Sequence, residues 1–164
     1  MSSLGVWPVV LRTTVVFILC VYLSRAPAAR VLASIAGGVA FAVGNVLFDF
    51  IAYSAGWWSY PELEDRSHGQ LAWYAAAGLA VAGIALIGWR VQGRYREKGL
   101  AIFLLAFAMF GLVRDWAMSR TAAWGILVFG TGAIPWIADY IGWLVLTTVA
   151  IMVQFAIAGD SARD

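Results

Sequence analysis

Long apolar runs separated by short polar stretches are the dominant pattern along this chain. An apolar run of about 20 residues is long enough to cross a bilayer as a helix. We predict such spans at roughly 5–24, 31–57, 71–92, 99–119 and 134–157. The polar stretches 60–70 and 90–98 are expected to be loops. The pattern predicts an all-α fold, a polytopic bundle of about five transmembrane helices.

The segment 121–133 does not fit this pattern simply. Residues 122–157 are almost all apolar, and a continuous helix of that length would measure about 54 Å. That length is too long for one crossing and too short for two crossings with a loop. Gly130-Thr131-Gly132 and Pro135 indicate a break. We therefore predict that 121–133 is a short interfacial or re-entrant segment before the last span.

The composition places the chain in the membrane class. Of 164 residues, 63% are apolar and only 12% are charged, whereas about a quarter of a soluble domain is charged. The length suits a single transmembrane domain, 1–164, without a soluble domain. One cysteine and one histidine argue against a zinc or haem site within the chain. No metal and no cofactor are expected.

Charged residues alternate in sign between the predicted loops. Basic residues follow the first and third spans, and acidic residues follow the second. The basic residues are Arg25, Arg30, Arg90, Arg94, Arg96 and Lys98, and the acidic ones are Glu62, Glu64 and Asp65. The positive-inside rule places the basic loops in the cytoplasm. The prediction is a multi-pass protein of the cell membrane, with its N-terminus outside and its C-terminus cytoplasmic.

The basic run 90–98 is interpreted as this topology signal, and it can also contact anionic membrane lipid. Nucleic acid is not expected to be a partner. His68 lies in the acidic loop, where we expect it to be solvated rather than catalytic.

Ionisable residues inside the apolar spans carry the most functional information. Asp49, Arg114, Asp115 and Asp139 all lie about 7–12 Å below the outer ends of their spans. Charged groups at this depth are costly, so they usually face the bundle interior and serve a function. Because three spans offer carboxylates at one level, we expect the acids to meet in one pocket.

Residues four positions apart on a helix lie near the same face, so Asn45 and Tyr53 should accompany Asp49, and Trp143 should accompany Asp139. Tryptophans are concentrated near the outer end, where they form an interfacial belt or line a cavity. The candidate substrate-binding residues are Asn45, Tyr53, Trp57, Trp58, Tyr60, Trp116, Trp136 and Trp143.

Two interpretations of the intramembrane charges stay open. Arg114 can pair with Asp49 or Asp139 and simply hold the helices together. One arginine cannot neutralise three carboxylates, however, so at least one aspartate should keep its proton and be able to donate it. On this second interpretation the catalytic candidates are Asp49, Asp115, Asp139 and Arg114.

A protonated acid in an aromatic-lined pocket suits acid-initiated isoprenoid chemistry. The acid would protonate a carbon–carbon double bond, and aromatic faces would stabilise the resulting cation. A dry site would protect the cation from water. A second carboxylate would then remove a proton, which gives cyclisation or isomerisation, whereas admitted water would give hydration.

One motif supports this direction. Asp49 is followed by Gly56 seven residues later, Trp58 nine later and Tyr60 eleven later. This spacing resembles the Asp…Gly-x-Trp-x-Tyr signature of the small membrane lycopene cyclases of carotenoid synthesis. The resemblance implies a membrane enzyme acting on a carotenoid-like substrate, with functional roles for these four residues.

A second segment is similar to a Pro…Asn-x-x-Gly-Trp element of the related membrane carotenoid hydratases. It contains Pro135, Asp139, Gly142 and Trp143, so aspartate stands in place of the asparagine, with one extra residue after the proline. The chain departs from the cyclases at Leu47-Phe48, where they have Pro-Trp, and it lacks their Pro-x-Glu-Glu element. The resemblance therefore implies a shared scaffold with a different substrate and reaction.

Several other functions lack their motifs. There is no phosphate-binding glycine loop followed by lysine, and Gly37-Gly38 within a span is expected to allow close helix packing. Aspartate-rich pairs that would hold Mg²⁺ and a diphosphate are missing, which argues against a prenyltransferase. The serines have no histidine partner within the spans, which argues against a serine hydrolase.

The leading hypothesis is an integral membrane enzyme, of the isomerase or lyase kind, acting on a lipid-soluble isoprenoid substrate. The first alternative is a small transporter or proton-coupled channel subunit that uses the buried charges as a relay. The second is a non-catalytic membrane assembly subunit. Expected partners are the substrate and membrane lipid, and assembly into a homo-oligomer stays open.

Overall fold

The computed structural model describes residues 6–61, 63, 65–120 and 127–159. In this part of the chain there are four helices and two short strands. They are α1 (Val6–Ser24), α2 (Ala28–Ser54), β1 (Trp58–Ser59), α3 (Leu71–Arg120), β2 (Val128–Phe129) and α4 (Ile134–Ala158). All four helices are long and apolar enough to cross a membrane. The prediction of an all-α transmembrane bundle is confirmed.

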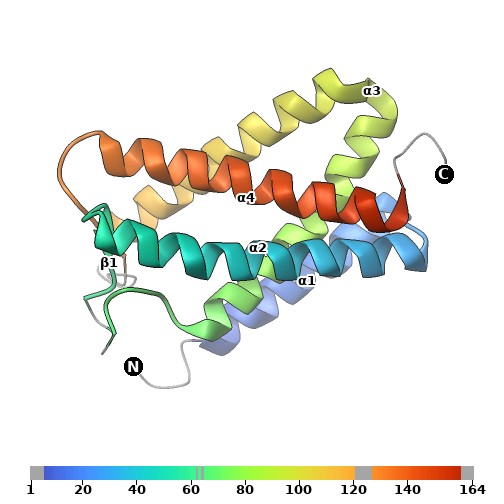
Figure 1. Cartoon of the computed structure of the whole chain (residues 1–164). Helices are drawn as coiled ribbons and strands as arrows, with labels where there is room; N and C mark the ends of the chain where they lie inside the picture. The colour runs from blue at the N-terminus through green and yellow to red at the C-terminus, as the bar shows by residue number, and fades with distance from the viewer. Residues whose placement is uncertain (1–5, 62, 64, 121–126, 160–164) are drawn as a thin grey trace.

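The prediction of about five separate helices is corrected by α3, which is a single element of 50 residues. At Arg96 its backbone leaves the helical region, with φ 60° and ψ −160°. Figure 1 shows α3 folding back on itself. Because this bend uses one residue, the polar stretch 90–98 is helical on both sides of Arg96 instead of being a loop. The two arms, 71–95 and 97–120, occupy the ranges expected for the third and fourth spans.

The segment 121–133 is only partly within the described residues, since 121–126 lie outside them. Residues 127–133 form β2 and a turn, not a helix. β2 pairs antiparallel with β1, and Trp58 lies opposite Phe129. Gly130 extends this contact, because its N–H donates to the Trp57 carbonyl at 2.7 Å. For residues 127–133 the predicted re-entrant helix is therefore replaced by a small β-ribbon that closes one end of the bundle.

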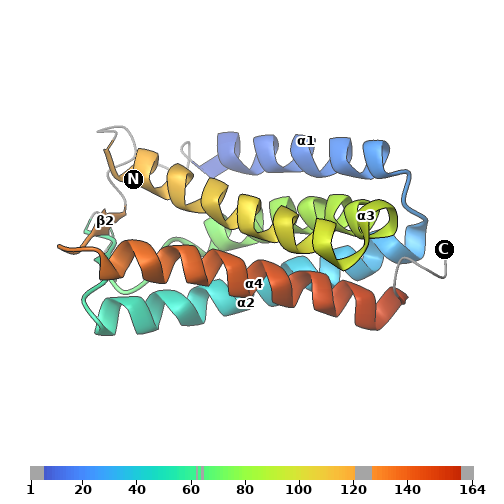
Figure 2. The same cartoon turned by 90° about the horizontal axis from the view of Figure 1, so that it is seen from above.

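Small residues let the helices approach closely. A Cβ added to Gly37 would lie 2.3 Å from the carbonyl oxygen of Ala150 on α4. One added to Gly38 would lie 2.3 Å from the carbonyl oxygen of Gly78 on α3. The prediction that Gly37-Gly38 serves close packing is confirmed, as is common where lipid gives no hydrophobic drive for association. α2 packs on both α3 and α4, whereas α1 packs on α3, on the side away from α4 (Figure 2).

The opposite end of the bundle is held together by arginines. Arg30 is 1% exposed, and its guanidinium donates to the carbonyl of Gly159 at 2.7 Å and to that of Ala158 at 3.2 Å. A cation at a helix C-terminus also complements the helix dipole. Arg90 donates to the carbonyl of Ser24 at 2.5 Å. The basic residues therefore lie at the end away from β1 and β2.

Candidate functional site

Three buried aspartates from three helices face one small cavity near the β1 end. Asp49 on α2, Asp115 on the second arm of α3 and Asp139 on α4 are 3%, 5% and 7% exposed. All three, together with Arg114, line a cavity of about 70 Å³. Such a volume is large enough for a few water molecules. The structure thus brings together the intramembrane charges that the sequence places at one depth.

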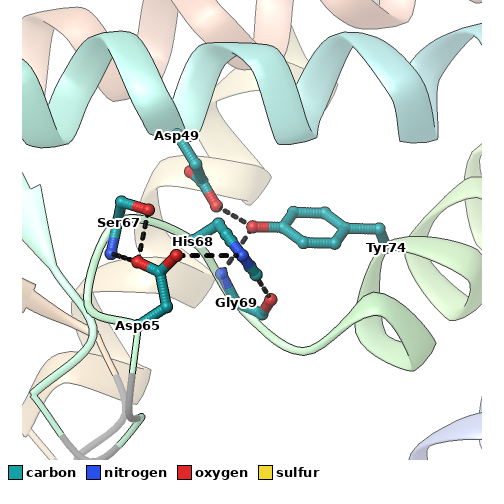
Figure 3. Close-up of polar contacts among 6 residues, drawn as sticks. All are labelled: Asp49, Asp65, Ser67, His68, Gly69 and Tyr74. Carbon is teal, nitrogen blue, oxygen red and sulfur yellow. Dashed lines mark hydrogen bonds and ion pairs between the residues drawn. The ribbon is translucent and has the colours of Figure 1, made fainter.

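Asp49 is surrounded by hydrogen-bond donors. Trp58 Nε1 donates to Oδ1 at 3.0 Å, and the Tyr60 hydroxyl donates to Oδ2 at 2.6 Å. The Tyr74 hydroxyl also donates to Oδ2, and it accepts the Gly69 N–H at 2.6 Å (Figure 3). The Gly69 N–H thus orients the Tyr74 hydroxyl toward the carboxylate. Three donors on two oxygens are the surroundings that an ionised carboxylate requires.

The segment between α2 and α3 positions two of these donors. Gly56 adopts a φ of +70°, which suits glycine, and it turns the chain back after α2. The Trp57 N–H then bonds the Ala52 carbonyl at 2.8 Å, and the Tyr60 N–H bonds the Arg66 carbonyl at 3.0 Å. Burial and the nearby Asp49 charge raise the pKa of Tyr60. Tyr60 therefore remains a neutral hydrogen-bond donor.

The rest of this loop is tied down by its own polar groups. Asp65 accepts the N–H of Ser67 at 2.8 Å and its hydroxyl at 2.5 Å, and these bonds lower the pKa of the Asp65 carboxyl. His68 Nδ1 lies 2.6 Å from the Gly69 carbonyl, and the His68 ring contacts the edge of Phe50. Figure 3 shows that His68 and Asp65 lie on the loop side of Asp49. These contacts hold Gly69 beneath Tyr74.

Asp115 is neutralised by its own neighbour. Arg114 donates to Asp115 Oδ1 from Nε at 2.8 Å and from Nη2 at 2.5 Å. Trp143 Nε1 donates to Oδ2 at 2.8 Å, and the guanidinium of Arg114 lies 4.7 Å from the centre of the Trp143 ring. The expected pairing of Arg114 with Asp49 or Asp139 is not what the structure shows. The long arginine side chain curls back to the adjacent carboxylate on its own helix.

Gly111 leaves the space that the Trp143 ring occupies. A Cβ at this position would lie only 2.3 Å from Trp143 Cδ2. Phe41 and Phe107 flank the same ring, with centroid distances of 5.4 and 5.9 Å. The indole is therefore fixed from three sides, with its N–H directed at Asp115.

Asp139 has the least complete hydrogen bonding of the three acids. Its Oδ2 is buried without a hydrogen-bond partner among the described residues. The Asp139 carboxyl is a neighbour of the Asp115 carboxyl. Two carboxyls in contact cannot both ionise without strong repulsion, and a shared proton removes it. The Asp115–Asp139 pair is thus suited to hold a proton beside the cavity.

Aromatic side chains make up much of the remaining cavity wall. They are Phe41, Phe48, Trp58, Trp73 and Trp143. The small cavity adjoins a larger one of about 420 Å³, with which it shares Asn45, Tyr60, Trp73, Arg114 and Met118. The larger volume is within the range typical of small-molecule sites. The two together provide an enclosed, mainly apolar space with acids at one end.

Half of the eight candidate substrate-binding residues lie at the acid cavity. These are Asn45, Trp58, Tyr60 and Trp143. The other four do not line it. Tyr53 and Trp116 are 44% and 48% exposed on the outside of the bundle. Trp57 lines a surface recess between α2 and α4, and Trp136 stacks on Phe129 at 4.1 Å.

The helix repeat explains why Tyr53 differs from Asn45. A step of four residues rotates the side chain by about 40°, so residues on either side of Asp49 diverge in opposite directions. Sequence reasoning also missed Tyr74 and Gly69, which complete the Asp49 network. Tyr74 is the fourth residue of α3, near the level of the acids, and this depth was the available signal.

The described residues contain no group of three or more histidine, cysteine, aspartate or glutamate side chains arranged to hold a metal ion. No protein-family model, curated protein or solved structure matches this chain. The resemblance to lycopene cyclases therefore remains a prediction that rests on its motif. Three motif residues, Asp49, Trp58 and Tyr60, are bonded to one another, so the spacing reflects a physical unit.

Proposed function

We propose that this protein is an integral membrane enzyme that carries out acid-initiated carbocation chemistry on an isoprenoid or carotenoid-like lipid. One observation carries the proposal: three buried aspartates on three helices line one aromatic cavity. Because the carboxyls differ in their hydrogen bonding, they can take different roles. An acid and a base in one dry site are what this chemistry needs.

The proton held between Asp139 and Asp115 is the one to be donated. Its transfer to a substrate double bond forms a C–H bond and leaves a cation on the neighbouring carbon. The faces of Trp143 and Trp58 stabilise that cation. A second double bond attacks it in cyclisation, and loss of a proton to the Asp49 carboxylate regenerates an alkene. Return of that proton from Asp49 to Asp139 restores the enzyme.

The Arg114 guanidinium has a supporting role in this scheme. It keeps Asp115 charged and in place through two hydrogen bonds. Asp115 in turn holds the proton on Asp139. Water admitted to the cavity would attack the cation instead, and the product would then be an alcohol.

The substrate can enter from the bilayer. An apolar recess of about 360 Å³ lies between α2 and α3 and reaches Tyr74, which bonds Asp49. We further propose that both arms of α3 cross the membrane. The end that carries Arg25, Arg30 and Arg90 then lies in the cytoplasm, and the acid cavity lies in the outer half, with the N-terminus outside.

A small proton-coupled transporter is the second candidate function. Thr147 and Gln154 lie on α4 between the acid cavity and the basic end, and both are 0% exposed. Thr147 Oγ1 and both polar atoms of the Gln154 side chain lack partners among the described residues. Buried polar groups of this kind favour a hydrated path through the bundle. A lateral assembly role is less consistent with acids that are buried.

The test is mass spectrometry of lipid extracts from cells that make linear isoprenoid precursors, with and without this protein. A product of unchanged mass and altered retention indicates cyclisation or isomerisation, and a gain of one water indicates hydration. Asp139→Asn should abolish the product because it removes the transferable proton. Tyr53→Phe is the matched control, since Tyr53 is exposed outside the cavity. A full yield of product from Asp139→Asn would refute the proposed acid.

A transporter gives a different result in vesicles. Reconstituted protein would move protons across the bilayer in response to a pH gradient, and Gln154→Leu would reduce that flux. If no precursor is converted and proton flux depends on Gln154, the enzyme proposal fails and the transporter is favoured.

A further inference from the structure

The larger cavity next to the acids has a charge that the isoprenoid chemistry does not require. It lies between α1 and both arms of α3, and it is lined by Arg12 from α1 and Arg114 from α3. Among the described residues that line it, none is acidic. The acids open only onto the smaller neighbouring cavity. The lining of the larger cavity is therefore cationic.

Arg12 is unusual for its position. It lies six residues into α1, about 9 Å from the start of a helix made mainly of apolar residues. A guanidinium facing lipid at that depth is costly. Its Nε donates to the Pro8 carbonyl of its own helix at 3.2 Å, and its side chain borders the cavity. The arginine thus faces the interior space that it shares with Arg114.

The rest of the lining fits an amphiphile. Asn45 and Tyr60 contribute polar groups where the two cavities join, and most other lining residues are apolar. Arginine forks match the oxygens of phosphate and carboxylate groups. A site with cations at one place and apolar walls elsewhere selects a molecule with an anionic head and an apolar tail.

We propose that this cavity binds the anionic head group, a phosphate or a carboxylate, of a single-chain isoprenoid between Arg12 and Arg114. The isoprenoid identity of the tail rests on the proposed function. Since the two cavities share Asn45, Tyr60 and Trp73, the double bond that receives the proton lies close to the head group. The substrate class is thereby narrowed from a neutral hydrocarbon to an anionic isoprenoid.

Binding measurements on the full chain in phosphatidylcholine nanodiscs test this proposal without requiring turnover. Geranylgeranyl phosphate is compared with geranylgeraniol, which has the same tail without the anion. The phosphate should bind at least about tenfold more tightly, as expected for a charge-assisted hydrogen bond. Arg12→Gln should reduce affinity for the phosphate about tenfold and leave affinity for the alcohol unchanged. Arg12→Lys should retain part of the preference.

The control variant is Arg94→Gln, which removes an exposed arginine from the opposite end of the bundle. It should leave both affinities unchanged. Equal affinities for the phosphate and the alcohol, or equal effects of Arg12→Gln and Arg94→Gln, would overturn the proposal. Arg12 is exposed to the cavity side of α1 and not buried in the bundle, so its replacement is compatible with folding.

Two further arms separate this proposal from its assumptions. Asp139→Asn should bind the phosphate normally, so loss of product with retained binding concerns the chemistry and not the anion site. Phosphatidic acid added to the nanodiscs supplies the same phosphate on a two-chain membrane lipid. If it displaces geranylgeranyl phosphate at equal concentration, the single-chain isoprenoid assignment is overturned and a membrane-lipid head group occupies the site.

Discussion

Replacing Gly111 by alanine should displace the Trp143 ring from the acid cavity. The new Cβ would lie 2.3 Å from Cδ2 and 2.4 Å from Cγ of the indole, far inside the 3.5–4.0 Å of normal carbon contact. Overpacking of this kind costs about 1–3 kcal/mol. Moving the ring also breaks the 2.8 Å bond to Asp115, which is worth about 1.5–3 kcal/mol when one partner is charged.

Alanine regains about 1 kcal/mol of helix propensity over glycine. The expected net loss in free energy of unfolding is therefore about 2–4 kcal/mol. Reversible unfolding in mixed micelles, titrated with SDS and followed by far-UV circular dichroism, measures it. Product formation should fall as well, because Trp143 and Asp115 shape the cavity.

Gly44→Ala is the matched control on α2. Its Cβ would lie 2.6 Å from Leu146 Cδ2, the mobile end of a flexible side chain, which can rotate away. We expect a change within about 1 kcal/mol of zero, since helix propensity offsets the adjustment. If Gly111→Ala is as stable as the unaltered protein, or if both variants lose equally, the argument that Gly111 positions the indole is refuted.

Three further changes test other parts of the structure. Tyr74→Phe should lower the free energy of unfolding by about 1.5–3 kcal/mol in the same titration, because it removes a donor from the Asp49 carboxylate; no loss would contradict an ionised Asp49. Arg30→Leu should cost about 2–4 kcal/mol by leaving the last carbonyls of α4 unsatisfied, whereas an effect below 1 kcal/mol would exclude a capping role. Ser67→Ala should raise the pKa of Asp65, measured by carboxyl ¹³C NMR, because a hydrogen bond to the charged form is lost. With its folded pKa lowered, Asp65 stabilises the fold above its unfolded pKa of about 3.9, and that stabilisation disappears as pH falls through the folded value; an unchanged pKa in Ser67→Ala would assign the shift to the backbone N–H.

The convergence of the acids was predictable because depth in a membrane helix follows directly from sequence. Each residue adds 1.5 Å, so Asp49, Asp115 and Asp139 could be placed at one level from their distance to the span ends. High cost of exposure to lipid then favoured an inward orientation. Which carboxyl bonds which donor depends on helix rotation and loop course, and neither is encoded in depth. Tyr74 was missed for this reason.

The course of α3 was harder to predict. Polarity at 90–98 suggested a loop, but arginine, lysine and glutamate are good helix formers, and at the membrane surface their charges stay in water. The helix can therefore continue to Arg96 and restart directly after it. The β1–β2 contact was equally hidden, because it joins strands of two residues each that lie about 70 positions apart.

The motif around Asp49 has a structural explanation that does not depend on chemistry. Gly56 turns the chain, and Trp58 and Tyr60 then return to bond the carboxylate seven to eleven residues after it. Any membrane bundle that must neutralise a buried aspartate by a returning loop could use this spacing, so the motif alone does not establish a carotenoid enzyme. Asp139 lies outside this unit, lacks a partner for Oδ2 and adjoins Asp115. The catalytic proposal therefore depends on Asp139 more than on the motif, and Asp139→Asn separates proton transfer from the structural role of Asp49.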